Sequence, residues 1–295
     1  MIKANTLDIA GEYAGAAAVF RDAVHVAEAS GDPRLPVAIN SLANADDELG
    51  RYSEAEQLYR RAMTAAAKDG VWNSTYALTL GNLGAHYVEV GRLDKAEALL
   101  RKSLAIYSAL LPGDSIPLAL VRNALANLMV GDRRYDEAGT LIEASLITFR
   151  KHPAPGSGEE AVGLNNLGVV RRYQGKNQEA IELFEQSIRI TETELGPSHP
   201  ALLRALNNLA TMYAAAGRHD DADAAFQRAV SIAEKRLGSS HPVYARVLLN
   251  YAGYLRRSGR KAVAKTLAAR ANALLRDHAR TNGNGMTIDV SAFRH

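Results

Sequence analysis

Asparagine side chains recur at a fixed spacing, and their chemistry gives the first indication of a function. One series, about 42 residues apart, consists of Asn40, Asn123, Asn165 and Asn207. Next to this series or one helical turn further along lie Asn82, Asn166, Asn208, Asn250, Asn44 and Asn127. An amide both donates and accepts hydrogen bonds, so exposed asparagines in a row could hold the backbone of an extended peptide. The alternative is structural, with some of these amides satisfying nearby helix ends or loops.

Charged residues beside the asparagines change sign along the chain. Acidic residues come early, namely Asp47, Glu48 and Glu89, and basic ones come late, namely Arg172, Arg204, Arg246, Arg256 and Arg257. A partner with opposite polarity at its two ends would be oriented by such a field. Because guanidinium groups match carboxylates, an acidic peptide or a partner's terminal carboxylate is expected at the late end. The other interpretation is that these charges are solvated or form ion pairs within the protein.

Catalytic and metal chemistry are not indicated by the remaining residues. The eight histidines form no His-x-x-x-His pair, and His199 and His241 are explained by their places at helix starts. There is no P-loop, no Gly-x-Ser-x-Gly motif and no dinucleotide fingerprint. Aromatic residues are not interleaved with a basic patch of the kind that binds nucleic acid. We therefore expect a protein that is not an enzyme and has no cofactor, catalytic residue or metal ligand.

Composition limits the class of protein further. The 35 basic and 32 acidic residues give a net charge of +3, too balanced to indicate a nucleic-acid or membrane surface. The chain has no cysteine, which excludes disulfides and thiolate sites. No apolar run is long enough for a signal sequence or a membrane span, so a cytoplasmic protein is expected. The excess of arginine over lysine and the many alanines suggest a bacterial source.

A repeated pattern must position these residues. Alanine recurs after a Gly-x-x-x-x or similar signal at positions 16, 55, 96, 138, 180, 222 and 264. The hinge glycines are Gly50, Gly91, Gly175, Gly217 and Gly259. Apolar residues on either side recur every three to four positions, which predicts two amphipathic helices per repeat, here called A and B. The glycines are expected to end helix A in the left-handed conformation.

Three departures from the pattern carry their own predictions. Arg133 replaces a hinge glycine, and Gly131 two residues earlier suggests that this repeat turns early. Asp46 and Arg171 stand where other repeats have tyrosine, so each must pair, line a groove or extend to the solvent. The breaker-rich joint at residues 151–158 is expected to be the most mobile link in the array.

The combined motifs resemble the tetratricopeptide repeat in the longer form typical of kinesin light chains. The resemblance rests on the Leu-Asn-Asn-Leu-Gly/Ala run, the hinge, the small residue at 62, 103, 145, 187, 229 and 271, and the Leu-Gly-x-x-His-Pro joint. It covers about residues 11–275 and implies an all-α, right-handed superhelical solenoid of antiparallel helix pairs. About six full repeats would follow an N-terminal partial repeat. Heptads like those preceding the repeats of kinesin light chains are absent, so motor binding is not implied.

The expected organisation is a solenoid over residues 1–280 and a flexible tail over residues 281–295. The leading hypothesis for function is a non-catalytic scaffold or adaptor that binds an extended peptide or a partner helix in the concave groove. One alternative is self-assembly, with residues 286–293 of the tail docking in a groove of the same or another copy. The other is an accessory or regulatory subunit of an enzyme.

Overall fold

The computed structural model describes residue 7, residues 11–154 and residues 156–282, and this part of the chain forms helices without strands. Its internal contacts divide it into two compact units, with the division between residues 154 and 155. That division falls inside the joint at residues 151–158. Each unit therefore has its own set of helix pairs.

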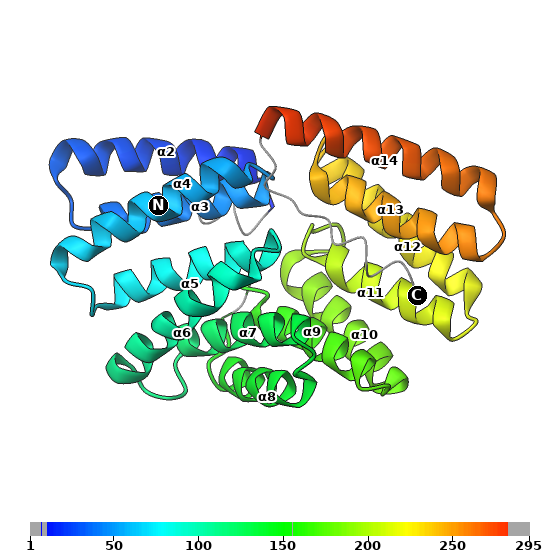
Figure 1. Ribbon diagram of the computed structural model, residues 1–295, viewed down its shortest axis with the longest axis horizontal. Helices are drawn as coiled ribbons and strands as arrows, with labels where there is room; N and C mark the ends of the chain where they lie inside the picture. The colour runs from blue at the N-terminus through cyan, green and yellow to red at the C-terminus, as the bar shows by residue number, and fades with distance from the viewer. Residues whose placement is uncertain (1–6, 8–10, 155, 283–295) are drawn as a thin grey trace. The chain divides into compact units, whose positions relative to one another are not determined.

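Among its described residues, the first unit contains helix α2 followed by three helix pairs (Figure 1). Helix α2 spans Tyr13–Ser30. The pairs are α3 (Leu35–Glu48) with α4 (Tyr52–Ala66), α5 (Ser74–Glu89) with α6 (Leu93–Leu110), and α7 (Ile116–Gly131) with α8 (Tyr135–Lys151). A short 3₁₀ helix, η1 (Ala67–Asp69), extends α4.

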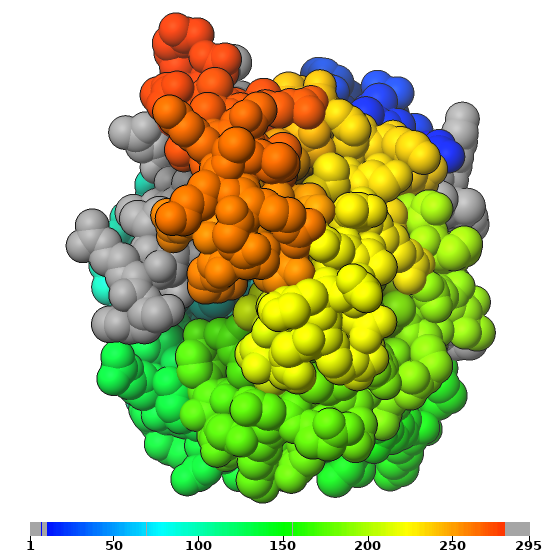
Figure 2. All heavy atoms as spheres, turned by 90° about the vertical axis from the view of Figure 1, so that its right-hand side faces the viewer, coloured from blue at the N-terminus to red at the C-terminus, as the bar shows by residue number. Residues whose placement is uncertain are grey.

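The second unit contains three more pairs. They are α9 (Glu159–Tyr173) with α10 (Asn177–Leu195), α11 (Leu202–Ala215) with α12 (His219–Arg236), and α13 (Pro242–Arg257) with α14 (Lys261–Asn282). Figure 2 shows α12 in yellow and α14 in orange on one face of this unit. Among the described residues, six A/B pairs thus follow α2, and the predicted fold class is confirmed. Residues 281–282 belong to α14, and the rest of the predicted tail lies outside the described residues.

Small side chains let the two helices of each pair approach closely. The hinge alanines are buried in every repeat, from Ala16 at 0% exposure to Ala264 at 4%. Gly168 on α9 faces the ring of Phe184 on α10 so closely that an added Cβ would lie 2.6 Å from Cε1. These positions therefore carry small residues because a neighbouring helix occupies the space.

Buried serines join the two helices of three pairs by the same hydrogen bond. Ser103, Ser145 and Ser187 each donate Oγ–H to a backbone oxygen of the preceding A helix, 26 residues earlier, at 2.7–2.9 Å. They occupy the small-residue position of the repeat and are at most 3% exposed. Each serine satisfies its own hydroxyl, so the position remains compatible with a closely packed interface.

The hinge of the third pair differs from its predicted form. The five hinge glycines take the left-handed conformation, with φ between 73° and 84°. Arg133 takes it too, with φ 60°, while Gly131 stays within α7. The backbone N–H of Arg134 donates to Met129 O at 2.9 Å, as the corresponding residues do in other repeats. The expectation of an early turn was wrong because these bonds hold Arg133 in the glycine conformation.

Replacing Arg133 with glycine should raise the free energy of unfolding by about 0.5–1 kcal/mol. A side chain at positive φ costs roughly 1–2 kcal/mol, and the added freedom of glycine in the unfolded chain offsets part of the gain. Urea denaturation monitored by circular dichroism measures the change. Asp132→Gly is the control, because Asp132 has φ −84° and should lose stability. A loss of stability in Arg133→Gly would contradict a strained hinge.

The two charged residues at the tyrosine position are both paired. Asp46 is only 3% exposed, and its Oδ1 accepts a hydrogen bond from Arg51 Nη1 at 3.0 Å. Burial raises the pKa of Asp46 above its ordinary value. Arg171 Nε lies 3.1 Å from Glu179 Oε2. Of the outcomes considered from the sequence, pairing is the one the structure supports.

Candidate functional site

Asparagine amides connect successive A helices of the second unit. Asn208 on α11 donates Nδ2–H to Asn165 Oδ1 on α9 at 2.9 Å. Asn250 on α13 donates in the same way to Asn207 Oδ1 on α11, also at 2.9 Å. We call these two bonds the asparagine rungs. They repeat because a 42-residue period places equivalent positions of neighbouring A helices side by side.

The asparagines are less exposed than the sequence suggested. Asn40, Asn123, Asn165 and Asn166 are 3–7% exposed, so the expectation that this series is exposed was wrong for these residues. Asn165 also donates Nδ2–H to Asn166 Oδ1 at 3.3 Å. Asn207, Asn208 and Asn250 are partly exposed, as are Asn82 and Asn127, while Asn44 is exposed. Some of the asparagine side chains are therefore buried and structural, and others remain accessible to a partner.

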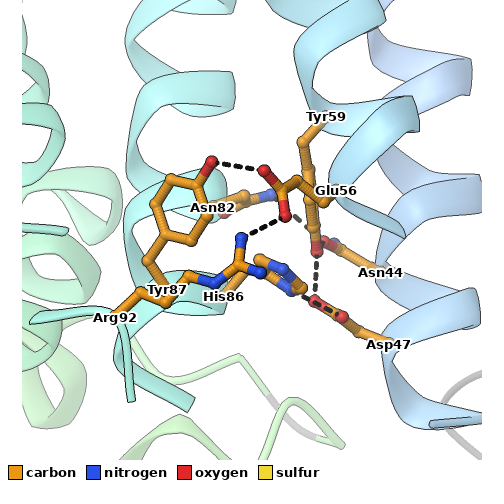
Figure 3. A network of polar contacts seen from close by, with 8 residues as sticks. All are labelled: Asn44, Asp47, Glu56, Tyr59, Asn82, His86, Tyr87 and Arg92. Carbon is orange, nitrogen blue, oxygen red and sulfur yellow. Dashed lines mark hydrogen bonds and ion pairs between the residues drawn. The ribbon is translucent and has the colours of Figure 1, made fainter. Parts of the chain in front are cut away.

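A polar network replaces the rungs in the first unit (Figure 3). His86 Nδ1 on α5 lies 2.7 Å from Asp47 Oδ1 on α3. The Tyr59 hydroxyl on α4 lies 2.6 Å from Asn44 Oδ1 and 3.0 Å from Asp47 Oδ2, and its single hydrogen serves one acceptor at a time. Asn82 Nδ2 approaches Asn44 Oδ1 at 3.4 Å. We call these five residues the His86 network.

Burial controls the ionisation of this network. It raises the pKa of the Asp47 carboxyl, although the hydrogen bond from His86 acts in the opposite direction. Burial and the neighbouring Asp47 hold the pKa of Tyr59 well above its ordinary value of 10.0. Tyr59 therefore stays protonated at neutral pH and acts as a donor. An Asp, His and Tyr set of this kind could move protons, but His86 is only 3% exposed, so its contacts serve helix packing.

For Asp47, the structure supports the second interpretation of the charged residues, a contact within the protein, because His86 and Tyr59 bind this carboxylate. His86 was not among the residues singled out from the sequence. A signal for His86 is present when the repeats are compared with one another. Its position carries Leu128, Val170 and Met212 in later repeats, all of them core residues. A histidine among apolar equivalents indicates a buried polar partner.

The arginines of the second unit lie at two levels of the A helices. Arg204 and Arg246 occupy equivalent positions in the first turns of α11 and α13, exposed and partly exposed respectively. Arg172 and Arg256 lie in the last turns of α9 and α13. Arg172 lies over the ring of Tyr173, 4.7 Å from its centroid. Basic residues in a last turn also favour the helix dipole, which gives Arg172 and Arg256 a structural role as well.

The described residues contain no group of three or more His, Asp and Glu side chains arranged to hold a metal ion. No helix in this part of the chain combines the length and the apolar character needed to cross a membrane. Neither result identifies a ligand. The side chains that remain accessible on the A helices include amides and arginines.

Known proteins with similar sequences and structures share this repeat. Protein KINESIN LIGHT CHAIN-RELATED 2 of Arabidopsis thaliana is 28% identical over 197 residues, which are 65% of this chain and 28% of that protein. This chain thus spans less than a third of that relative. BtubC (BKLC) from P. vanneervenii is 27% identical in its crystal structure, with a TM-score of 0.56 over 73% of this chain and 89% of that one.

A more distant structure shares the fold alone. It is the Rap conjugation gene regulator of the plasmid pLS20 in complex with the Phr* peptide, 12% identical, with a TM-score of 0.62 over 89% of this chain and 80% of that one.

Family models described as tetratricopeptide repeat match residues 75–156, 159–235 and 203–277, and another with that description matches residues 37–68. These models describe a repeat and not an enzyme. The resemblance to repeats of the kinesin light chain type is confirmed by the Arabidopsis and P. vanneervenii proteins. Together with the six helix pairs, the matches show that this chain belongs to the tetratricopeptide repeat family.

Proposed function

We propose that this chain is a non-catalytic scaffold that binds an extended peptide segment of a partner protein along the A helices of its second unit. The partner segment would lie across α9, α11 and α13 and contact the accessible amides and arginines. Its backbone would be held by the asparagines, and its acidic groups by the arginines. The family supports this class of function, because tetratricopeptide repeats generally serve as interaction scaffolds.

The observation that carries the proposal is the unused hydrogen-bonding capacity beside the asparagine rungs. An asparagine amide offers two N–H donors and two acceptor sites. Asn208 and Asn250 each use one N–H in a rung, and Asn207 uses its oxygen. All three are partly exposed. The rungs fix these amides in place, so a peptide backbone would meet donors and acceptors that are already oriented.

Arginine chemistry supports an acidic partner. Arg204 and Arg246 repeat at the same helical position, and the exposed Arg256 lies about 15 Å along α13 from Arg246. A guanidinium binds a carboxylate with two parallel hydrogen bonds. Arg204 and Arg246 also interact with other groups of the protein, which restricts their rotamers. The fold itself is compatible with peptide binding, since the Rap regulator with the same fold was solved with a peptide.

Selection of random displayed peptides against the full chain tests this proposal. We expect selected sequences to be enriched in Asp and Glu. Fluorescence anisotropy of the synthetic peptides should show about tenfold weaker binding or more for Arg246→Ala and for Arg256→Ala, because a hydrogen bond to a charged group contributes roughly 1.5–3 kcal/mol. Binding should also weaken as salt concentration rises.

Arg276→Ala is the matched control, because Arg276 is an exposed arginine on the B helix α14. It should leave peptide affinity unchanged. The melting temperature of Arg276→Ala should match the parent, and those of Arg246→Ala and Arg256→Ala should fall by only about 2–4 °C, because each of these arginines also has a minor structural role. Peptides without acidic enrichment, or affinities unaffected by both A-helix variants, would count against the proposed surface.

A further inference from the structure

One accessible position recurs on the three A helices of the second unit, and its side chain changes character along them. Val162 on α9, Arg204 on α11 and Arg246 on α13 are spaced 42 residues apart and stand at the same place in their repeats. Val162 is 46% exposed, Arg204 is exposed and Arg246 is partly exposed. We call these three residues the Val-Arg-Arg row. It presents one apolar side chain followed by two cations.

The row lies beside the amides of the proposed peptide site. Asn208 and Asn250 follow Arg204 and Arg246 by four residues, so each amide is on the same side of its helix as the arginine. The separation along the helix axis is about 6 Å, which a long arginine side chain bridges. A segment whose backbone is held by the two amides therefore places its side chains within reach of the row.

The asparagine rungs fix the distance between neighbouring members of the row. The rung from α11 to α9 and the rung from α13 to α11 are both 2.9 Å long, so the same contact joins each pair of neighbouring A helices. The axes of helices packed in contact lie about 8–10 Å apart. Equivalent residues on α9, α11 and α13 are therefore separated by steps of about this length.

This step matches one backbone conformation of an extended peptide. In polyproline II, three residues make one turn and rise about 9.3 Å, so every third side chain points the same way. Side chains on one face of a β-strand repeat at about 6.6 Å or 13 Å, which is shorter or longer than the step. A polyproline II backbone also makes no internal hydrogen bonds. Its carbonyl oxygens can therefore accept from Asn208 and Asn250, with one amide for each turn.

The position over α9 does not favour an acidic residue. Glu159 precedes Val162 by three residues and is on the same side of α9. The residues in its place in the next two repeats are Ala201 and Val243. A carboxylate over α9 would thus meet an apolar side chain and another carboxyl group, whereas a carboxylate over α11 or α13 meets a guanidinium.

Building on the proposed function, we propose that the partner segment binds in the polyproline II conformation and carries one apolar and two acidic residues, each three positions from the next. The apolar residue contacts Val162, and the acidic residues bind Arg204 and Arg246. The helices set this order, whichever way the segment runs. The site thus selects a spacing as well as a charge.

Synthetic proline-rich peptides test the spacing with the full-length chain. The reference peptide has valine at its first position, glutamate at its fourth and seventh, and proline elsewhere. Its reversed sequence is measured beside it by fluorescence anisotropy, and the tighter binder is kept. Moving the last glutamate by one position should weaken binding about tenfold or more, because one guanidinium loses its carboxylate. Glycine and serine in place of the prolines should also weaken binding about tenfold, because the flexible peptide must then be ordered.

Val162→Arg tests which helix contacts which side chain. This variant should bind a peptide with glutamate at all three positions about tenfold more tightly than the parent does, because the new guanidinium binds the third carboxylate. Val263→Arg is the matched control, since Val263 is a 53% exposed valine on the B helix α14. The control adds the same charge and should leave that affinity unchanged.

The outcomes separate this inference from the proposed function. Equal affinity for the two glutamate spacings, or for proline and glycine-serine spacers, would overturn the polyproline II conformation. An equal gain for Val162→Arg and Val263→Arg would overturn the contact with α9. In each of these cases acidic peptides still bind, so the proposed function stands. A chain that binds no acidic peptide would contradict the proposed function, and this inference with it.

Discussion

Gly168→Ala should lower the free energy of unfolding by about 1–3 kcal/mol, although alanine is the better helix former. The new Cβ would lie 2.6 Å from Phe184 Cε1 and 2.9 Å from Cδ1. Phe184 is completely buried, so its ring cannot turn aside without displacing α10 from α9. Overpacking therefore outweighs the gain in helix propensity. Urea denaturation of the full chain measures the change.

Gly253→Ala is the matched control, because Gly253 is also in an A helix of the second unit. The nearest atom to its added Cβ is Arg257 Nη1 at 3.6 Å, an ordinary contact at the end of a flexible side chain. This variant should gain about 0.5–1 kcal/mol from helix propensity. The two glycine variants should thus differ in sign, and a stabilised Gly168→Ala would contradict close packing of α9 against α10.

Asp47→Val should lower the free energy of unfolding by about 1–3 kcal/mol, because it leaves the buried His86 imidazole without its acceptor. Valine is the residue at the equivalent positions Val88 and Val130. Adding His86→Leu, the residue found at Leu128, should recover most of the loss. Removing both partners of a buried hydrogen bond costs far less than removing one. Tyr59 keeps its acceptor Asn44 at 2.6 Å in every variant.

A double-mutant cycle of these two changes isolates the coupling between them. Asp32→Ala is the control for losing an aspartate ion pair, since Asp32 pairs with Arg34 at an exposed site. It should produce a much smaller change than Asp47→Val. Additive effects of Asp47→Val and His86→Leu would mean that the 2.7 Å contact contributes nothing to stability.

The same aspartate should make stability depend on pH in a defined direction. Burial raises the pKa of Asp47 above its ordinary value of 3.8, so the folded state binds its proton more tightly than the unfolded state. The stabilisation from this proton is complete below pH 3.8 and is lost as the pH rises through the raised pKa. The advantage of the parent over Asp47→Val in unfolding free energy, measured by urea denaturation at a series of pH values, should therefore be largest at the acidic end and shrink as the pH rises. An advantage that grows with pH would contradict a raised pKa.

The repeat pattern predicted the helices and most of their core. Leu164, Leu167 and Val170 on the A helix and Phe184 on the B helix are buried as their spacing indicated. The hinge glycines were equally predictable, because positive φ favours one residue type. Arg133 was not, since its conformation is imposed by hydrogen bonds of the surrounding turn and not by its own preference.

Exposure of the candidate binding residues could not be read from the spacing. The period places Asn165 and Asn208 on adjacent helices, but their 2.9 Å bond depends on how closely those helices approach. Whether the accessible amides and arginines bind a partner stays a prediction.

The serine bonds and the asparagine rungs also determine how the chain can fold as it is synthesised. A serine bond closes over 26 residues, and a rung over 43. Contacts of such short range involve little loop-closure entropy, which is associated with fast folding. Each helix pair can therefore form soon after its last residue leaves the ribosome. A rung then joins the A helix of that pair to the A helix of the pair before it. Within the second unit, folding is expected to proceed pair by pair in the order of translation.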